Sequence, residues 1–80
     1  MAYSGGLIKV KGCTIEKNQI GIQSGLGNGP EFAGTIILES SIVRDNSGYG
    51  AISCAGSTIT LKGATFKNRQ DFWEDGGTIR

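Results

Sequence analysis

The side chains with the greatest capacity for chemistry are the carboxylates, because the 80 residues include no histidine. Histidine is the commonest general base and metal ligand, so nucleophilic triads and most transition-metal sites have no support. Hydrolysis of a glycosidic bond needs two carboxylates across a substrate groove, and proton abstraction beside bound calcium needs clustered acids and a base. The acids that could contribute are Glu16, Glu31, Glu39, Asp45, Asp71, Glu74 and Asp75.

The placement of these acids gives little support for catalysis. Asp45 beside Arg44 comes nearest to a catalytic pair. Asp71, Glu74 and Asp75 could hold a cation, although a solvated acidic turn is the commoner arrangement of such a group. The sequence therefore favours a protein that is not an enzyme, and it predicts no catalytic residue and no metal.

Thiolate and phosphate chemistry have no motif to support them. Cys13 and Cys54 lack C-x-x-C spacing. The glycine-rich stretch 25–34 contains no G-x-x-x-x-G-K-[ST] phosphate-binding sequence. We therefore predict no cofactor, and we expect the two cysteines to be half-buried thiols that fill core space, without a disulfide between them.

Residues suited to contact a partner gather in two stretches. Residues 25–34 hold four glycines and the one proline, which indicates a surface loop that either binds a partner or folds back onto the body. Residues 69–80 hold the one tryptophan. Their aromatic rings either stack on a sugar or anchor a protein partner, or they cap the end of the fold. The candidate binding residues are Phe32, Asp71, Phe72, Trp73 and Glu74.

A segment that recurs three times must position these residues. Val10, Leu38 and Leu61 occupy the same place in it and lie 28 and then 23 residues apart, a spacing typical of repeat architectures. Apolar residues alternate with polar ones in each copy, and the 14 glycines mark tight turns between strands. We therefore predict a single all-β domain over residues 1–80. Its repeat units span approximately 7–34, 35–57 and 58–80.

Each unit is predicted to contain up to three short strands. Small residues mark a bend between the first and second strands, and a turn with asparagine separates the second from the third. The first two units supply a third strand at 21–24 and 50–54. The third unit leaves the pattern after Asn68, so we expect residues 69–80 to form a cap without a strand.

Charged residues at equivalent positions support this alignment. Strands of successive units that stack about 4.8 Å apart would bring like charges into repulsion. Lys11, Glu39 and Lys62 alternate in sign, and four of five neighbouring charged pairs are complementary. The exception places Arg44 beside Lys67.

The pattern over Leu7 to Asn68 is I-x-V/L, a small residue, T-I/F, a turn with asparagine, and then G-I or G-A-I. It resembles the right-handed parallel β-helix of the pectate-lyase-like superfamily, which includes polysaccharide lyases, polygalacturonase-type hydrolases and phage tail-spike proteins. The resemblance implies a short solenoid of about three coils with a ladder of stacked asparagines, matched here by Asn18 and Asn46. The third unit has Arg69 at that place with Asn68 beside it, so the ladder ends or shifts by one residue there.

Composition limits the partners. Eight basic residues against seven acidic ones give no general attraction for nucleic acid. No apolar run approaches the ~20 residues of a membrane span, and no secretory signal is visible, so we expect a cytoplasmic or virion-associated protein without membrane partners. A short stack of strands has open edges that invite pairing with another chain, which predicts a homo-oligomer.

Three functions remain open from the sequence. The leading hypothesis is a non-catalytic structural or binding module that self-associates and binds a protein or a polysaccharide through residues 25–34 and 69–80. The second is a small inhibitor encoded by a phage or mobile element that presents one face to a host protein. The third is a piece of a polysaccharide lyase or glycoside hydrolase.

Overall fold

The computed structural model describes residues 6–25 and 33–80. Every regular element in these ranges is a strand, so they contain no helix that could cross a membrane. The strands are β1 (Leu7–Lys11), β2 (Thr14–Glu16), β3 (Ile20–Ser24), β4 (Thr35–Glu39), β5 (Ile42–Arg44), β6 (Tyr49–Cys54), β7 (Thr58–Lys62), β8 (Thr65–Lys67), β9 (Gln70–Asp75) and β10 (Thr78–Ile79).

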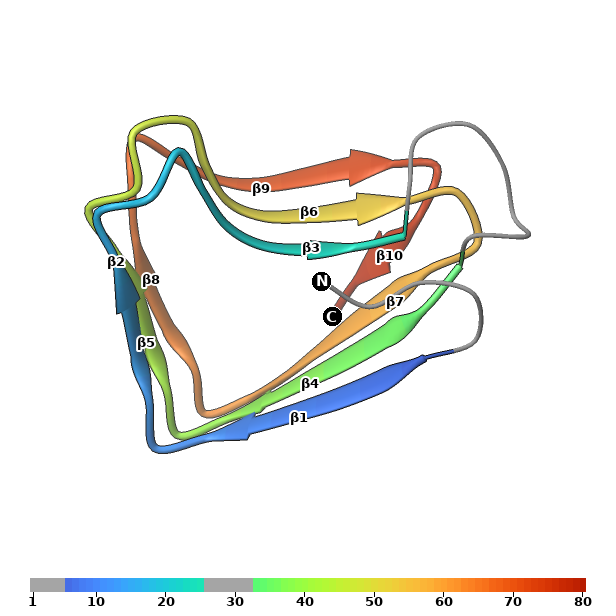
Figure 1. Cartoon of the computed structure of the whole chain (residues 1–80), viewed down its shortest axis with the longest axis horizontal. Helices are drawn as coiled ribbons and strands as arrows, with labels where there is room; N and C mark the ends of the chain where they lie inside the picture. Colours follow the sequence, from blue (N-terminus) through green and yellow to red (C-terminus); the bar gives the residue numbers. More distant parts are fainter. Residues whose placement is uncertain (1–5, 26–32) are drawn as a thin grey trace.

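The strands form three parallel sheets, which lie on three sides of a common interior (Figure 1). The first sheet has the order β1-β4-β7-β10, the second β2-β5-β8 and the third β3-β6-β9. The chain therefore runs through the three sheets in the same sequence again and again. We call β1–β3 the first pass, β4–β6 the second and β7–β9 the third, after which β10 returns to the first sheet. The predictions of an all-β fold and of parallel strands are confirmed.

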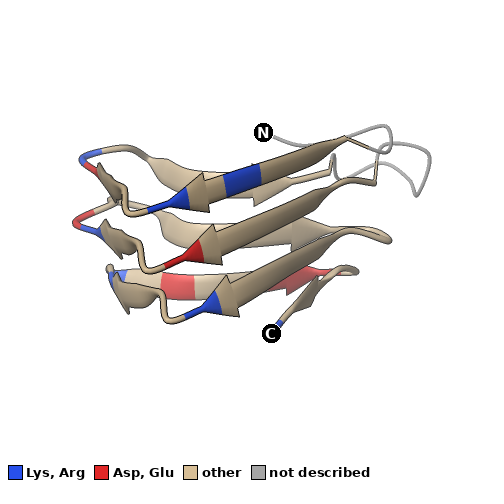
Figure 2. Ribbon diagram, turned by 90° about the horizontal axis from the view of Figure 1, so that it is seen from below, with Lys and Arg blue, Asp and Glu red and all other residues tan. Residues whose placement is uncertain are grey.

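The register of the first sheet agrees with the predicted alignment. Val10 lies beside Leu38, and Leu38 lies beside Leu61. Glu39 lies between Lys11 and Lys62, and Figure 2 shows the resulting blue, red and blue segments at the ends of β1, β4 and β7. Opposite charges on neighbouring strands attract, so this register is favoured on the outside of the sheet as well as inside it.

The repulsion within the one like-charged pair is offset by nearby carboxylates. Arg44 does lie beside Lys67. However, its Nε is 3.2 Å from Oε2 of Glu16 on the opposite neighbouring strand and 3.9 Å from Oδ2 of Asp45. Two carboxylates therefore offset the repulsion from the one ammonium group.

The core lies between the three sheets and is deepest in the second pass. Strands of the second pass have a neighbour on both sides, whereas those of the first and third passes have a neighbour on one side over much of their length. Burial follows this arrangement, since four of the five residues of the core cluster come from the second pass. They are Ile36, Leu38, Val43 and Ala51, and the fifth is Ile59 of the third pass.

The expectation that residues 69–80 lack a strand is wrong. Gln70–Asp75 form β9, which pairs in parallel with β6, and the chain then adds β10 to β7. The alternation of β9 is hidden because two aromatic residues are adjacent and three acids accompany them. This composition is compatible with a strand here because β9 is the edge of its sheet and has a single neighbour.

The expectation for the two cysteines is also partly wrong. Both thiols are free, but Cys13 is exposed and Cys54 is buried, so neither is half-buried. Cys13 follows the bend at Gly12, where the backbone is left-handed with φ of 64°, and its Sγ–H donates to the carbonyl of Lys11. It therefore lies at an outer corner between two sheets and fills no core space.

Candidate functional site

Asparagine side chains connect the three passes at the turn between the second and third sheets. Oδ1 of Asn46 accepts the backbone N–H of Asn18 at 3.1 Å. Nδ2 of Asn46 donates to Oδ1 of Asn68 at 2.7 Å, and the same oxygen accepts the backbone N–H of Asn46 at 3.1 Å. Asn46 is 1% exposed. The contacts therefore form a continuous hydrogen-bonded series through the turn.

Asn68 holds the third place in this series one residue early. In the first two passes a left-handed residue precedes the asparagine, with φ of 61° at Lys17 and 56° at Asp45. In the third pass β8 ends at Lys67 and Asn68 follows at once. The third turn therefore omits the left-handed residue and keeps the asparagine.

Asp71 ends the series. Its Oδ1 accepts the backbone N–H of Asn68 at 2.8 Å and the side-chain Nδ2 of Asn68 at 3.1 Å. In the pairing of the third sheet Asp71 corresponds to Gly21 and Gly50. A Cβ at Gly50 would lie 2.5 Å from Nδ2 of Asn68, so a side chain at this place is excluded in the second pass. In the third pass the carboxylate of Asp71 fills the place of the next asparagine.

Trp73 and Phe72 lie on opposite faces of β9 and do not form one binding platform. The Trp73 ring stacks on Tyr49 with centroids 5.3 Å apart and planes inclined by 29°. The Phe72 ring lies 4.7 Å from that of Phe66, which packs against the core cluster. Side chains of adjacent strand residues point to opposite faces, so Trp73 points outward and Phe72 inward.

The two remaining acids of β9 contact the chain itself. Oε2 of Glu74 accepts the backbone N–H of Ile79 at 3.1 Å and so fastens β10. Asp75 lies beside Cys54 in the pairing of β9 with β6. Burial raises the pKa of the Cys54 thiol, and the negative charge of Asp75 raises this pKa further. Within residues 6–25 and 33–80, no group of three metal-ligating side chains gathers.

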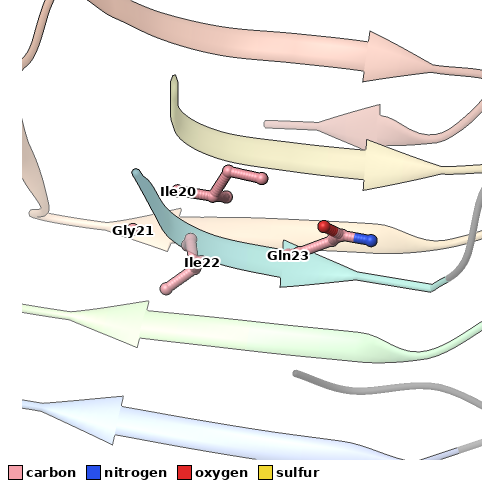
Figure 3. A pocket seen from close by; sticks show the side chains of 4 residues that line it. All are labelled: Ile20, Gly21, Ile22 and Gln23. Atoms are coloured by element: carbon pink, nitrogen blue, oxygen red, sulfur yellow. The ribbon is translucent and has the colours of Figure 1, made fainter. Parts of the chain in front are cut away.

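A hollow of about 280 Å³ lies at β3, the edge strand of the third sheet (Figure 3). Ile20, Gly21, Ile22 and Gln23 line it. None of these residues was a sequence candidate for binding. The signal that could have found them is the complete lack of charge from Ile20 to Ser24, because edge strands are usually protected by charged side chains.

The structure thus separates the candidate residues. It places Asp71 with Asn68 and Asn46, Trp73 with Tyr49, and Phe72 with the core. Phe32 and most of the stretch 25–34 lie outside the described residues. Sequence reasoning missed Tyr49, because its partner Trp73 was not recognised as part of a strand.

The chain was compared with family models, curated proteins and solved structures, and none of them matches it. The geometry alone must therefore indicate the function. Among the described residues, most of the candidate side chains take part in contacts that hold the fold together. The outward face of the Trp73 ring and the unpaired strand edges of these residues are accessible to another molecule, and both are suited to binding.

Proposed function

We propose that this chain is a short right-handed parallel β-helix that acts as a non-catalytic binding and assembly module. In this proposal the three passes are its coils, with approximate spans 7–34, 35–57 and 58–80. The recurring order of the three parallel sheets supports the β-helix, and the sequence pattern supports a place in the pectate-lyase-like superfamily. The module self-associates and binds a protein or a polysaccharide.

The observation that carries the proposal is the position of the exposed apolar side chains. Among the residues that the structure describes, four of the five exposed large hydrophobic residues lie on the first or the third pass. Leu7 and Ile20 are 59% and 37% exposed on the first pass, and Phe72 and Trp73 are each 45% exposed on the third. Apolar surface that gathers at unpaired strand edges is stabilised by a second chain that covers it.

Trp73 is the proposed contact for a further partner. Its ring points outward and is held in place by stacking on Tyr49, so a flat, partly exposed aromatic surface is available without loss of side-chain freedom on binding. Sugar rings stack on such a surface, and aromatic side chains are also frequent anchors of protein interfaces.

Sedimentation velocity over a wide concentration range tests self-association. We expect the wild-type chain to sediment as an oligomer, and a monomer at every concentration would contradict this part of the proposal. Trp73→Ala is compared with Ile42→Ala, because Ile42 is 41% exposed on the second pass and serves as a matched control. Loss of the oligomer with Trp73→Ala alone would place the tryptophan at the contact between copies.

Tryptophan fluorescence tests the partner. Trp73 is the only tryptophan, so a ligand that covers its ring changes the emission directly. Oligosaccharides are titrated first and bound proteins are then captured with the wild-type chain and Trp73→Ala in parallel. Absence of any response or capture that depends on Trp73 would contradict the binding part of the proposal.

A further inference from the structure

The two ends of the stack of strands differ in how they are closed. At the end formed by the third pass, β10 covers part of the edge of β7, and Leu61 of β7 donates its backbone N–H to the carbonyl of Arg80. Asp71 satisfies the last asparagine of the series. At the end formed by the first pass, β1, β2 and β3 are all edge strands of their sheets. Among the residues that the structure describes, the third-pass end is therefore partly covered, at β7, although β8 and β9 are edge strands, and no strand covers the first-pass end. We call these the capped end and the open end.

The open end contains one edge that lacks protection by charge. β1 carries Lys9 and Lys11, and β2 carries Glu16. At the capped end the edge strand β9 carries three acids. β3 carries no charged residue over its five positions, its Ile20 is exposed, and the hollow of about 280 Å³ lies along it. A strand with these properties readily accepts a further strand as a neighbour.

We propose that two copies of the chain join through their open ends, with β3 of one copy paired antiparallel with β3 of the other. The result is a closed dimer with a two-fold axis. The inference rests on the proposed self-association and names the surface that carries it. Head-to-tail stacking is disfavoured because β10 already occupies part of the edge of β7 that β1 of the next copy would need.

The area of the end sets the strength of the contact. The two longer dimensions of the molecule are 29 and 22 Å between Cα positions. Two such ends in contact bury on the order of 1,000 Å² in total, which is near the lower limit for specific interfaces. We therefore expect a dimer that dissociates in the micromolar range rather than a permanent one.

A pair of lysine substitutions at opposite ends tests the surface. Ile20 and Gln70 occupy the same column of the third sheet, on either side of Tyr49, and both are exposed. Ile20→Lys places a charge on the open edge and should weaken dimerisation by at least about tenfold, because the ammonium group would be buried without a partner. Gln70→Lys is the matched control at the capped end and should leave the dissociation constant unchanged.

Circular dichroism and urea denaturation verify that each variant is folded.

Sedimentation velocity separates the outcomes. A dimer that is weakened by Ile20→Lys and left unchanged by Gln70→Lys supports the inference. An oligomer that is lost with Gln70→Lys but not with Ile20→Lys refutes the inference and leaves self-association intact. Species that grow beyond a dimer do the same. A wild-type chain that is monomeric throughout refutes both the inference and the self-association on which it rests.

Discussion

Replacement of Asn46 by alanine tests whether the asparagine series holds the passes together. The buried side chain accepts the backbone N–H of Asn18 at 3.1 Å. Its Nδ2 donates to the carbonyl of Arg44 at 3.2 Å and to Oδ1 of Asn68 at 2.7 Å. Alanine removes these three hydrogen bonds, together with a longer one from Nδ2 to the carbonyl of Ile15 at 3.5 Å, and leaves a small void between the second and third sheets.

The magnitude follows from these contacts. Each hydrogen bond contributes about 1 kcal/mol net, and the void adds to their loss. We expect the free energy of unfolding to fall by about 3–4 kcal/mol. A domain of 80 residues has a total of roughly 4–12 kcal/mol. The variant should therefore unfold at a temperature lower by roughly 15–30 °C.

Urea denaturation followed through the fluorescence of Trp73 measures this loss, with circular dichroism as a second probe. Asn18→Ala is the matched control, because Asn18 is exposed and its side chain makes one hydrogen bond, to the carbonyl of Glu16 at 3.0 Å. It should cost no more than about 1 kcal/mol. The reasoning is refuted if Asn46→Ala costs as little as Asn18→Ala.

An isosteric variant separates hydrogen bonding from volume. In Asn46→Asp the carboxylate can still accept from Asn18, but a second oxygen replaces the donor that faces Arg44 and Asn68. The new oxygen then faces the carbonyl oxygen of Arg44 and Oδ1 of Asn68 with no proton to share, and the carboxylate adds a buried charge. Asn46→Asp should therefore be less stable than Asn46→Ala at neutral pH, and the difference should shrink as the pH falls and the carboxyl group is protonated.

Three further predictions concern close packing and the two thiols. Gly50→Ala should lower the free energy of unfolding by about 1–3 kcal/mol, because its Cβ would lie 2.5 Å from Nδ2 of Asn68 and 2.8 Å from the carbonyl oxygen of Asp71. The same urea assay measures this loss. Ser47→Ala is the control, because Ser47 is exposed in the same turn. Cys13 should react with a thiol reagent in the folded protein, whereas Cys54 should react only after unfolding. Because the pKa of Cys54 is raised in the folded state, its contribution to stability is complete below the ordinary thiol pKa of about 8.5 and is lost as the pH rises through the raised value. The fall in stability between neutral and alkaline pH should thus be smaller in Cys54→Ala, and an equal fall in both proteins would contradict this.

The register of the first two passes could be predicted because both faces of the strands carry information. Inward positions are apolar in each pass, and outward charges alternate in sign, as from Lys11 to Glu39. A shift by one residue would place every inward side chain on the outer face. Only one register of the strands therefore satisfies both the apolar pattern and the charge pattern.

The third pass could not be predicted equally well because edge strands obey weaker constraints. β9 has one neighbour, so its residues need not alternate cleanly between apolar and polar types. The stacking of Trp73 on Tyr49 and the contact of Asp71 with Asn68 both depend on this strand. Because the sequence pattern predicts a cap and no strand over residues 69–80, neither contact is foreseeable from the residues themselves.

Inward positions of the sheets tolerate very different side chains, and this bears on how relatives of the chain should be sought. Ile22, Ala51 and Phe72 share one column of the third sheet, although their volumes differ widely. The strand spacing varies as well, since Val10 and Leu38 are 28 residues apart and Leu38 and Leu61 are 23 apart. Parallel neighbours demand an apolar inward residue at such positions and little more.

The turn between the second and third sheets is constrained far more closely. Asn46 must both accept and donate hydrogen bonds. Gly21 and Gly50 can take a side chain only at a cost in stability, because a Cβ at either would lie within 3.0 Å of Nδ2 of the asparagine in the following pass. An asparagine followed three or four residues later by glycine, as at Asn18 and Asn46, is therefore the part of the pattern that geometry requires. Relatives with the same architecture should keep this pair even where the apolar columns have changed beyond recognition.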